Sequence, residues 1–143
     1  MSDIEYNGKY YYEPPLETQL ALQDIKVHTF RYYPQECLMI ASDLFAEDFS
    51  CKKFFTNTPH SITPLVCPED ANKILNIATE IDAGHDSVSV MVRSTHKNTN
   101  YRIKLRVIKK DSSGKALICS GTVENINEYI FSNQLIEALS QDY

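Results

Sequence analysis

Residues 101–107 read Tyr-Arg-Ile-Lys-Leu-Arg-Val, so apolar and basic side chains alternate at every step. Such alternation is typical of a β-strand with one face buried, because successive side chains point to opposite faces. Polar turns at 97–100 and 111–114 separate this stretch from two runs with the same period. Those runs are Val88, Val90 and Val92 on one side and Leu117, Cys119, Gly121 and Val123 on the other. The three strands are therefore expected to form an antiparallel meander.

A helix is predicted upstream of this meander, over residues 68–83. Pro68 suits the first helical position, and Glu69 and Asp70 place carboxylates in the first turn, where they favour the helix dipole. Gly84 suits a C-terminal cap. An apolar stripe at three- and four-residue steps is formed by Ala71, Ile74, Leu75, Ala78 and Ile81.

The other elements follow from periodicity and turn residues. We expect, in chain order, an arm at 1–12, an amphipathic helix at 16–25, a hairpin of strands at 27–33 and 37–40, short helical turns at 43–65, and a helix at 126–139. This order predicts an α+β fold: a five-stranded antiparallel sheet with helices on one face and a flanking helix at each end.

Length and charge limit the possible roles. The chain has 143 residues, the size of one domain with a single core. It divides into an N-terminal arm and helix at 1–25, a core at 26–126 and a linker or signalling helix at 127–143. The net charge of −5 argues against nucleic-acid binding. No apolar run is long enough to span a membrane, and the N-terminus lacks the pattern of a secretory signal.

The cysteines indicate a reducing compartment. None forms a C-x-x-C pair or has a histidine at metal-ligand spacing, so no metal site is expected. Without a secretory signal, we expect reduced thiols packed as small hydrophobic groups, and a cytoplasmic location. The residues concerned are Cys37, Cys51, Cys67 and Cys119.

Four segments resemble the motifs of one family, in the same order and at similar separations. Residues 66–70 (V-C-P-E-D) resemble the V-H-P-E-D opening of the long helix in PAS domains of the PAC-containing type. Residues 101–103 (Y-R-I) resemble their G-x-Y-R-W strand start, and residues 111–115 (D-S-S-G-K) are similar to their D-x-x-G-K turn. Residues 121–128 (G-T-V-E-N-I-N-E) resemble the closing G-x-x-x-D-I-T-E. The likeness covers roughly residues 26–128.

This resemblance implies a PAS core in a bacterial signalling protein. Such a domain is regulatory: it binds a small ligand or dimerises, and it relays a signal to an output domain such as a GGDEF diguanylate cyclase or a two-component histidine kinase. The sequence departs from the motifs at Cys67, where His is common, at Ile103, where Trp is common, and at Asn125, where Asp is common. The closing motif is the family's junction to the next domain, so the resemblance assigns signal relay to Asn125 and Ile126.

No catalytic constellation is recognisable. None of the four histidines lies in a nucleophile motif, and stabilisation of a helix start accounts for the Glu69–Asp70 pair. The family's haem-binding members would offer a histidine from the long helix, but residues 68–82 contain none. Its flavin-binding members would carry N-C-R-F-L-Q, whereas residues 49–54 read F-S-C-K-K-F. Haem and flavin signatures are thus absent and the cofactor is unknown. The alternative is a small α+β enzyme, an isomerase or hydratase, which would need a polar group at the inward strand positions.

A ligand pocket is expected between the inner face of the sheet and the helices. The alternative is that its apolar members simply fill the core. The candidate residues are Phe30, Tyr32, Phe54, Phe55, His60, Ile74, Val90, Ile103 and Leu105, with Val92 and Ser61 beside them.

Two surfaces are candidates for partners. The flanking helices carry apolar stripes that a small core cannot fully cover, which predicts a homodimer through them. The basic side chains of the meander form a stripe on one sheet face that could meet an acidic partner or simply be solvated. This stripe comprises Arg102, Lys104 and Arg106, with Lys109 and Lys110 beyond.

Overall fold

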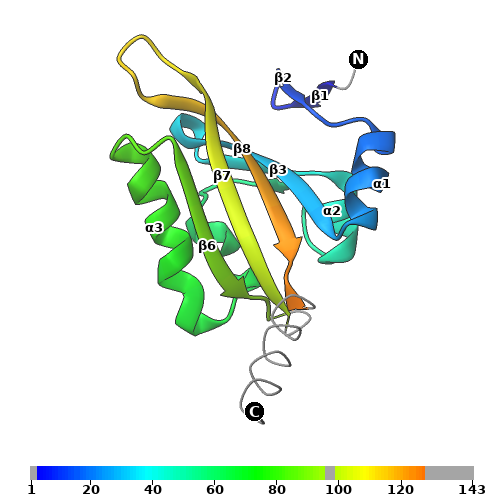
Figure 1. Cartoon of the computed structure of the whole chain (residues 1–143). Helices are drawn as coiled ribbons and strands as arrows, with labels where there is room; N and C mark the ends of the chain where they lie inside the picture. Colours follow the sequence, from blue (N-terminus) through cyan, green and yellow to red (C-terminus); the bar gives the residue numbers. More distant parts are fainter. Residues whose placement is uncertain (1–2, 96–98, 128–143) are drawn as a thin grey trace, which may run out of the picture.

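The computed structural model describes residues 3–95 and 99–127, and it confirms the α+β architecture. Its main sheet is antiparallel, with strand order β5-β4-β3-β8-β7-β6 (Figure 1). The strands are β3 (Val27–Tyr33), β4 (Leu38–Ala41), β5 (Phe54–Phe55), β6 (Ser87–Arg93), β7 (Asn100–Lys110) and β8 (Ala116–Asn125). The predicted meander is therefore present as β6, β7 and β8. Residues 128–139 of the expected C-terminal helix and residues 97–98 of the expected turn lie outside the described residues.

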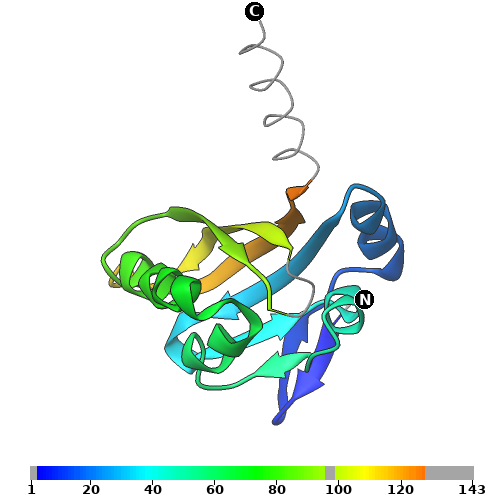
Figure 2. The same ribbon diagram turned by 90° about the horizontal axis from the view of Figure 1, so that it is seen from below.

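Helices and short 3-10 segments complete the domain. Seen from below, α3 and η2 lie together on one side of the strands, which we call the inner face (Figure 2). The bounds are α1 (Leu16–Asp24), η1 (Pro34–Glu36), α2 (Asp43–Asp48), η2 (His60–Leu65), η3 (Pro68–Asp70) and α3 (Ala71–Asp82). No helix of residues 3–95 and 99–127 is long and apolar enough to cross a membrane.

The sheet has six strands, not the five expected, because Phe54 and Phe55 pair with β4. Met39 lies opposite Phe55, and Ile40 lies opposite Phe54. A two-residue strand shows no measurable alternation, so sequence periodicity could not reveal it. The pairing points Phe55 to the inner face and Phe54 to the outer face.

The N-terminal arm is instead a β-hairpin of β1 (Asp3–Tyr6) and β2 (Lys9–Tyr12). Its turn residues, Asn7 and Gly8, both have positive φ angles, 50° and 77°. Two consecutive positive φ angles define the type I′ turn, for which Asn-Gly is the preferred sequence. This Asn-Gly turn, rather than the irregular run of tyrosines around it, is the sequence feature that indicates the hairpin.

The hairpin packs on the outer face of the sheet and forms a second, smaller core there. The ring of Tyr6 stacks on Phe54 at 4.4 Å, and Tyr11 meets Tyr33 edge to face at 4.9 Å. The Tyr11 hydroxyl donates a hydrogen bond of 2.6 Å to Glu36. Burial and this carboxylate raise the pKa of Tyr11 to about 12, so the phenol stays protonated and keeps donating. The outer face is thus covered at β3, β4 and β5.

The register of the paired strands determines which side chains form the core on the inner face. Phe30 lies opposite Gly121, which in turn lies opposite Leu105, and Leu105 lies opposite Val88. Because directly opposite residues share a face, these side chains form one row across four strands. Phe30 occupies the space above Gly121 that a larger residue would fill.

The helix α3 begins three residues later than predicted, because Pro68–Asp70 forms a 3-10 turn before it. The Asp70 carboxylate accepts a hydrogen bond of 2.8 Å from the Arg93 backbone N–H and lies 3.1 Å from Lys73 Nζ. These interactions, the backbone bond foremost, hold the pKa of Asp70 below its usual value. Asp70 thereby fixes the start of α3 against the end of β6.

The apolar residues of α1 do not face the core. Leu16 and Leu20 are exposed, while Gln19 is buried. The Gln19 side chain donates to the Pro14 carbonyl at 2.9 Å and accepts from the Leu44 N–H at 3.1 Å. A fully hydrogen-bonded amide can be buried at little cost, so α1 docks through this polar contact and leaves its leucines outside.

The four cysteines are unpaired thiols, as predicted. Cys119 is buried and Cys51 is half-buried, and burial raises the pKa of both thiols, to about 11 for Cys119. Cys37 departs from the expected packing, because it is exposed and has a positive φ of 49° at the end of η1.

Candidate ligand cavity

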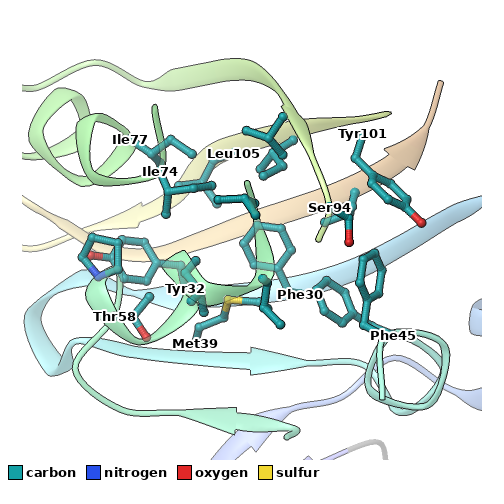
Figure 3. A pocket seen from close by; sticks show the side chains of 18 of the residues that line it. Phe30, Tyr32, Met39, Phe45, Thr58, Ile74, Ile77, Ser94, Tyr101 and Leu105 are labelled. Atoms are coloured by element: carbon teal, nitrogen blue, oxygen red, sulfur yellow. The ribbon is translucent and has the colours of Figure 1, made fainter. Parts of the chain in front are cut away.

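An apolar cavity of about 80 Å³ lies between the inner face of the sheet and α3, α2 and η2 (Figure 3). Ile74 and Ile77 project into it from α3, opposite Phe30 and Tyr32 on β3 (Figure 3). Phe45, from α2, contributes to the wall near Tyr101.

Several predicted pocket residues line this cavity: Phe30, Tyr32, Ile74, Val92, Ile103 and Leu105. Alternation points the five strand residues inward from β3, β6 and β7, and Ile74 faces them from α3. Phe55 is buried in the same core but does not reach the cavity, and Val90 packs against that core from a half-buried position without lining it.

Two predicted residues lie elsewhere, which corrects the sequence interpretation. Phe54 faces the outer side of the sheet, where it stacks on Tyr6. His60 is exposed at the start of η2, and Ser61 beside it is half-buried. Both errors have one cause: residues 43–65 lack a long regular element, so no period indicates which way a side chain points.

The sequence interpretation also missed much of the lining. Phe45 and Phe49 are one helical turn apart on α2, and Tyr101 begins the alternating run, so these three carried a usable signal. Ala78, in the apolar stripe of α3, and Val123, in the alternating run of β8, also carried a signal, whereas the loops and η2 gave none. The remaining missed residues are Met39, Thr58, Pro59, Ile62, Leu65, Val66, Ile77, Ala78, Ser94 and Val123.

Few polar groups reach the cavity. The Thr58 hydroxyl donates to the Phe55 carbonyl at 2.8 Å, so it is already engaged in the wall. Burial raises the pKa of Tyr101, and it raises the pKa of Tyr32 to about 12, so both phenols are neutral. The cavity therefore favours an apolar occupant. It is smaller than the pockets of ~300–1,000 Å³ that hold drug-sized ligands.

A buried histidine lies next to the cavity without lining it. His28 is on β3, facing inward, and its Nε2 lies 3.0 Å from a carboxylate oxygen of Asp48. The imidazole contacts the rings of Phe45 and Phe49, which line the cavity. This is the polar inward group that the enzyme alternative required, but it does not line the cavity. Among the described residues, no group of three or more His, Cys, Asp and Glu side chains is placed to hold a metal.

The two predicted relay residues lie where β8 ends. The Asn125 N–H donates to the Lys26 carbonyl, and its side chain accepts from the Asn127 N–H, both at 3.0 Å. Ile126 is buried, and its N–H donates to the Asn100 carbonyl at 3.0 Å. The amide oxygen of Asn125 thus accepts a backbone hydrogen bond from two residues further on, as a carboxylate oxygen could.

No protein-family model matches the chain, and no curated protein matches it. Solved structures do match. A sensory box histidine kinase/response regulator from Burkholderia thailandensis gives a TM-score of 0.61 at 14% identity, covering 88% of this chain and 96% of that chain. The N-terminal domain of a diguanylate cyclase with PAS/PAC sensor from Marinobacter aquaeolei gives 0.58 at 15% identity, covering 73% and 98%. The PAS domain of BvgS from Bordetella pertussis gives 0.55 at 13% identity, covering 90% and 97%.

The chain has the PAS fold. Because the sequence identities are only 13–15%, these similarities show the fold alone. In this PAS fold the cavity lies between the inner sheet face and α3, while the N-terminal hairpin and α1 lie toward β3 (Figure 1).

Proposed function

We propose that this PAS domain is a regulatory, non-enzymatic sensor that binds a small apolar molecule in the inner-face cavity and relays binding to an output domain. The observation that carries the proposal is the cavity, whose wall is almost wholly aliphatic and aromatic. Similar folds occur in a histidine kinase and in a diguanylate cyclase, which makes either activity a reasonable output. Cysteine usage supports a cytoplasmic location.

A short path connects the cavity to the end of β8. Tyr101 lines the cavity, and the neighbouring Asn100 accepts from the Ile126 N–H. The Asn100 N–H also donates to the Asn127 side chain at 2.8 Å. A ligand that displaces Tyr101 would therefore strain the hydrogen bonds that hold Ile126 and Asn127, and Asn127 in turn donates to the Asn125 side chain. This is the route by which we propose that binding reaches the C-terminal segment.

Filling the cavity tests the proposal. Ala78 lines it, so Ala78→Leu adds three carbon atoms to a space of about 80 Å³. We expect native mass spectrometry of protein purified from its host to show a retained small molecule in the wild type and none in Ala78→Leu. Thermal denaturation with benzene, toluene and indole gives a second readout: a ligand at a hundredfold excess over its Kd stabilises by about 2.7 kcal/mol. We expect that gain in the wild type and not in the variant.

Ala83→Leu is the matched control, because Ala83 is exposed just beyond the same helix. It should retain the molecule and the stabilisation. If Ala78→Leu binds as the wild type does, or if the wild type binds none of the molecules, the cavity is only a packing defect and the ligand proposal fails.

We further propose that two copies of the domain pair through the N-terminal segment. Five of the seven large hydrophobic residues that are exposed among those described lie within residues 10–25: Tyr10, Tyr12, Leu16, Leu20 and Ile25. Clustered exposed apolar residues are typical of interfaces. A second copy is the favoured occupant, because a two-fold axis brings such a patch against itself and buries it on both sides.

The double substitution Leu16→Glu/Leu20→Glu should abolish this pairing, since it places charges in the apolar patch. Sedimentation velocity is the measurement: we expect a dimer for the wild type and a monomer for the variant. Ile108→Glu is the control, because Ile108 is comparably exposed but lies on β7. A monomeric wild type at high concentration, or a dimer that survives the double substitution, would refute pairing through α1.

A further inference from the structure

A second hollow lies on the outer face of the sheet, opposite the ligand cavity. It has a volume of about 180 Å³ and is enclosed between the segment 12–18 and strands β3, β4 and β8. In contrast to the inner cavity, it is lined by hydroxyl and charged groups, among them Glu13, Thr18, Thr29, Arg31, Ser42 and Ser120. Apolar side chains, among them Pro14, Ile40 and Ala41, complete the wall, so the hollow offers polar groups beside an apolar surface.

Thr29 is the first indication of a ligand. Thr29 lines this hollow, and its Oγ1 is buried with no hydrogen-bond partner among residues 3–95 and 99–127. An unpaired buried hydroxyl is costly, so native proteins rarely keep one without a reason. A hydroxyl at the wall of a hollow can donate to a ligand oxygen.

Arg31 is the second indication. Its guanidinium is stacked over the Tyr12 ring at 4.2 Å from the centroid. It forms no ion pair with a carboxylate of the described residues. The Glu13 carboxylate, which lines the same hollow, forms its ion pair with Lys53 and not with the Arg31 guanidinium. A half-buried, pre-positioned arginine without a carboxylate suits the bidentate binding of an oxyanion.

The strand register places further cationic and hydroxyl side chains in line with Arg31 and Thr29 on the neighbouring strands. Ser120 lies opposite both Arg31 and Arg106, and Thr122 lies opposite both Thr29 and Lys104. These six side chains form two rows of cations and hydroxyls with no carboxylate, although the chain has a net charge of −5. Ser120 also borders an adjoining shallow hollow of about 470 Å³ over β6, β7 and β8. We call the two rows the hydroxyl–cation grid.

We propose that the hollow beside the hydroxyl–cation grid binds a small molecule through an oxyanion, either a carboxylate or a phosphate. Arg31 binds two oxygens of the anion, and the Thr29 and Ser120 hydroxyls donate to it. The 180 Å³ hollow holds the anionic group, while the neighbouring surface near Arg106 receives the rest of the molecule or a second charge. Because the site touches the N-terminal segment on one side and the sheet on the other, its occupant would hold the two together.

The test is isothermal titration calorimetry with inorganic phosphate and, separately, with succinate, at constant ionic strength. We expect at least one anion to bind, and the preferred anion distinguishes phosphate esters from carboxylic acids as the natural class. Arg31→Gln should lose binding beyond detection. Thr29→Val should weaken binding about tenfold, the cost of one hydrogen bond to a charged group. Thr29→Val should leave the unfolding temperature unchanged or raised, since the lost hydroxyl has no protein partner.

Controls separate a built site from general attraction to positive charge. Arg93→Gln removes an exposed cation from β6, away from the hollow, and should leave the affinity unchanged. If Arg31→Gln fails to fold, Arg31→Lys keeps the charge but loses the bidentate geometry, and it should still weaken binding. The proposal is overturned if neither anion binds, if Arg93→Gln weakens binding as much as the Arg31 variants, or if Thr29→Val binds as tightly as the wild type.

Discussion

Gly121→Val is expected to destabilise the domain by about 3 kcal/mol, the upper end of the usual cost of overpacking a core. A Cβ atom at position 121 would lie 2.5 Å from Cε1 and Cε2 of Phe30 and closer still to Cζ. The ring lies 6.3 Å from the Phe45 ring and lines the ligand cavity, so we expect it to retreat into that space. Urea unfolding followed by circular dichroism measures the loss. We also expect the variant to bind no apolar ligand, because the displaced ring fills the space.

Phe30→Ala provides the decisive comparison, because it removes the ring that causes the clash. In that background Gly121→Val should cost much less than it does alone, and the difference is the coupling energy of a double-mutant cycle. Thr122→Val, on the same strand but half-exposed on the outer face, should change stability by no more than about 0.5 kcal/mol. Equal costs of Gly121→Val in both backgrounds would show that Phe30 is not what excludes a side chain there.

Phe45→Ala is expected to cost about 3–5 kcal/mol, the usual range for removing a buried phenyl group. Phe45 is 3% exposed, and its ring centroid lies 4.9 Å from that of Phe49 and 6.0 Å from that of His28. The substitution removes part of the cavity wall, so the cavity grows while the core loses contacts. Thermal unfolding in the presence of benzene should recover part of the loss, since the added molecule fills the enlarged space.

Phe54→Ala is the matched control. Phe54 belongs to the smaller outer core and is only half-buried, so its removal should cost less. Benzene should not rescue it, because the substitution opens no part of the inner cavity. Equal costs for the two variants, or equal rescue, would contradict the assignment of Phe45 to the cavity wall.

Sequence patterns predicted the long elements because apolar residues recur in them at a regular spacing. Val88 to Val92 and Tyr101 to Val107 alternate over enough positions to define both strand and face, and α3 shows its stripe over three turns. Elements shorter than one full period were missed. The two-residue strand Phe54–Phe55 is the clearest example, and its register decides that only one of the two rings points inward.

Buried polar contacts also escaped prediction. Gln19 is buried because both ends of its amide find partners, one of them in α2, and no local pattern predicts a partner 25 positions away. Thr29 similarly has the pattern of an ordinary strand residue, and it borders a hollow only because the segment 12–18 packs beside it in the fold. Sequence periodicity reports which face is apolar, whereas polar sites depend on which distant segments meet.

The N-terminal hairpin changes what should be regarded as the minimal unit of this domain. Tyr33, Leu38 and Ile40 are each about 5% exposed or less, and the hairpin covers them. A fragment trimmed to begin at Lys26, where the motif resemblance starts, would leave these side chains uncovered on a sheet near its edge strand. Uncovered apolar surface of this kind promotes aggregation. Domain swapping or fusion experiments that transplant this domain should therefore carry residues 3–25 along with it.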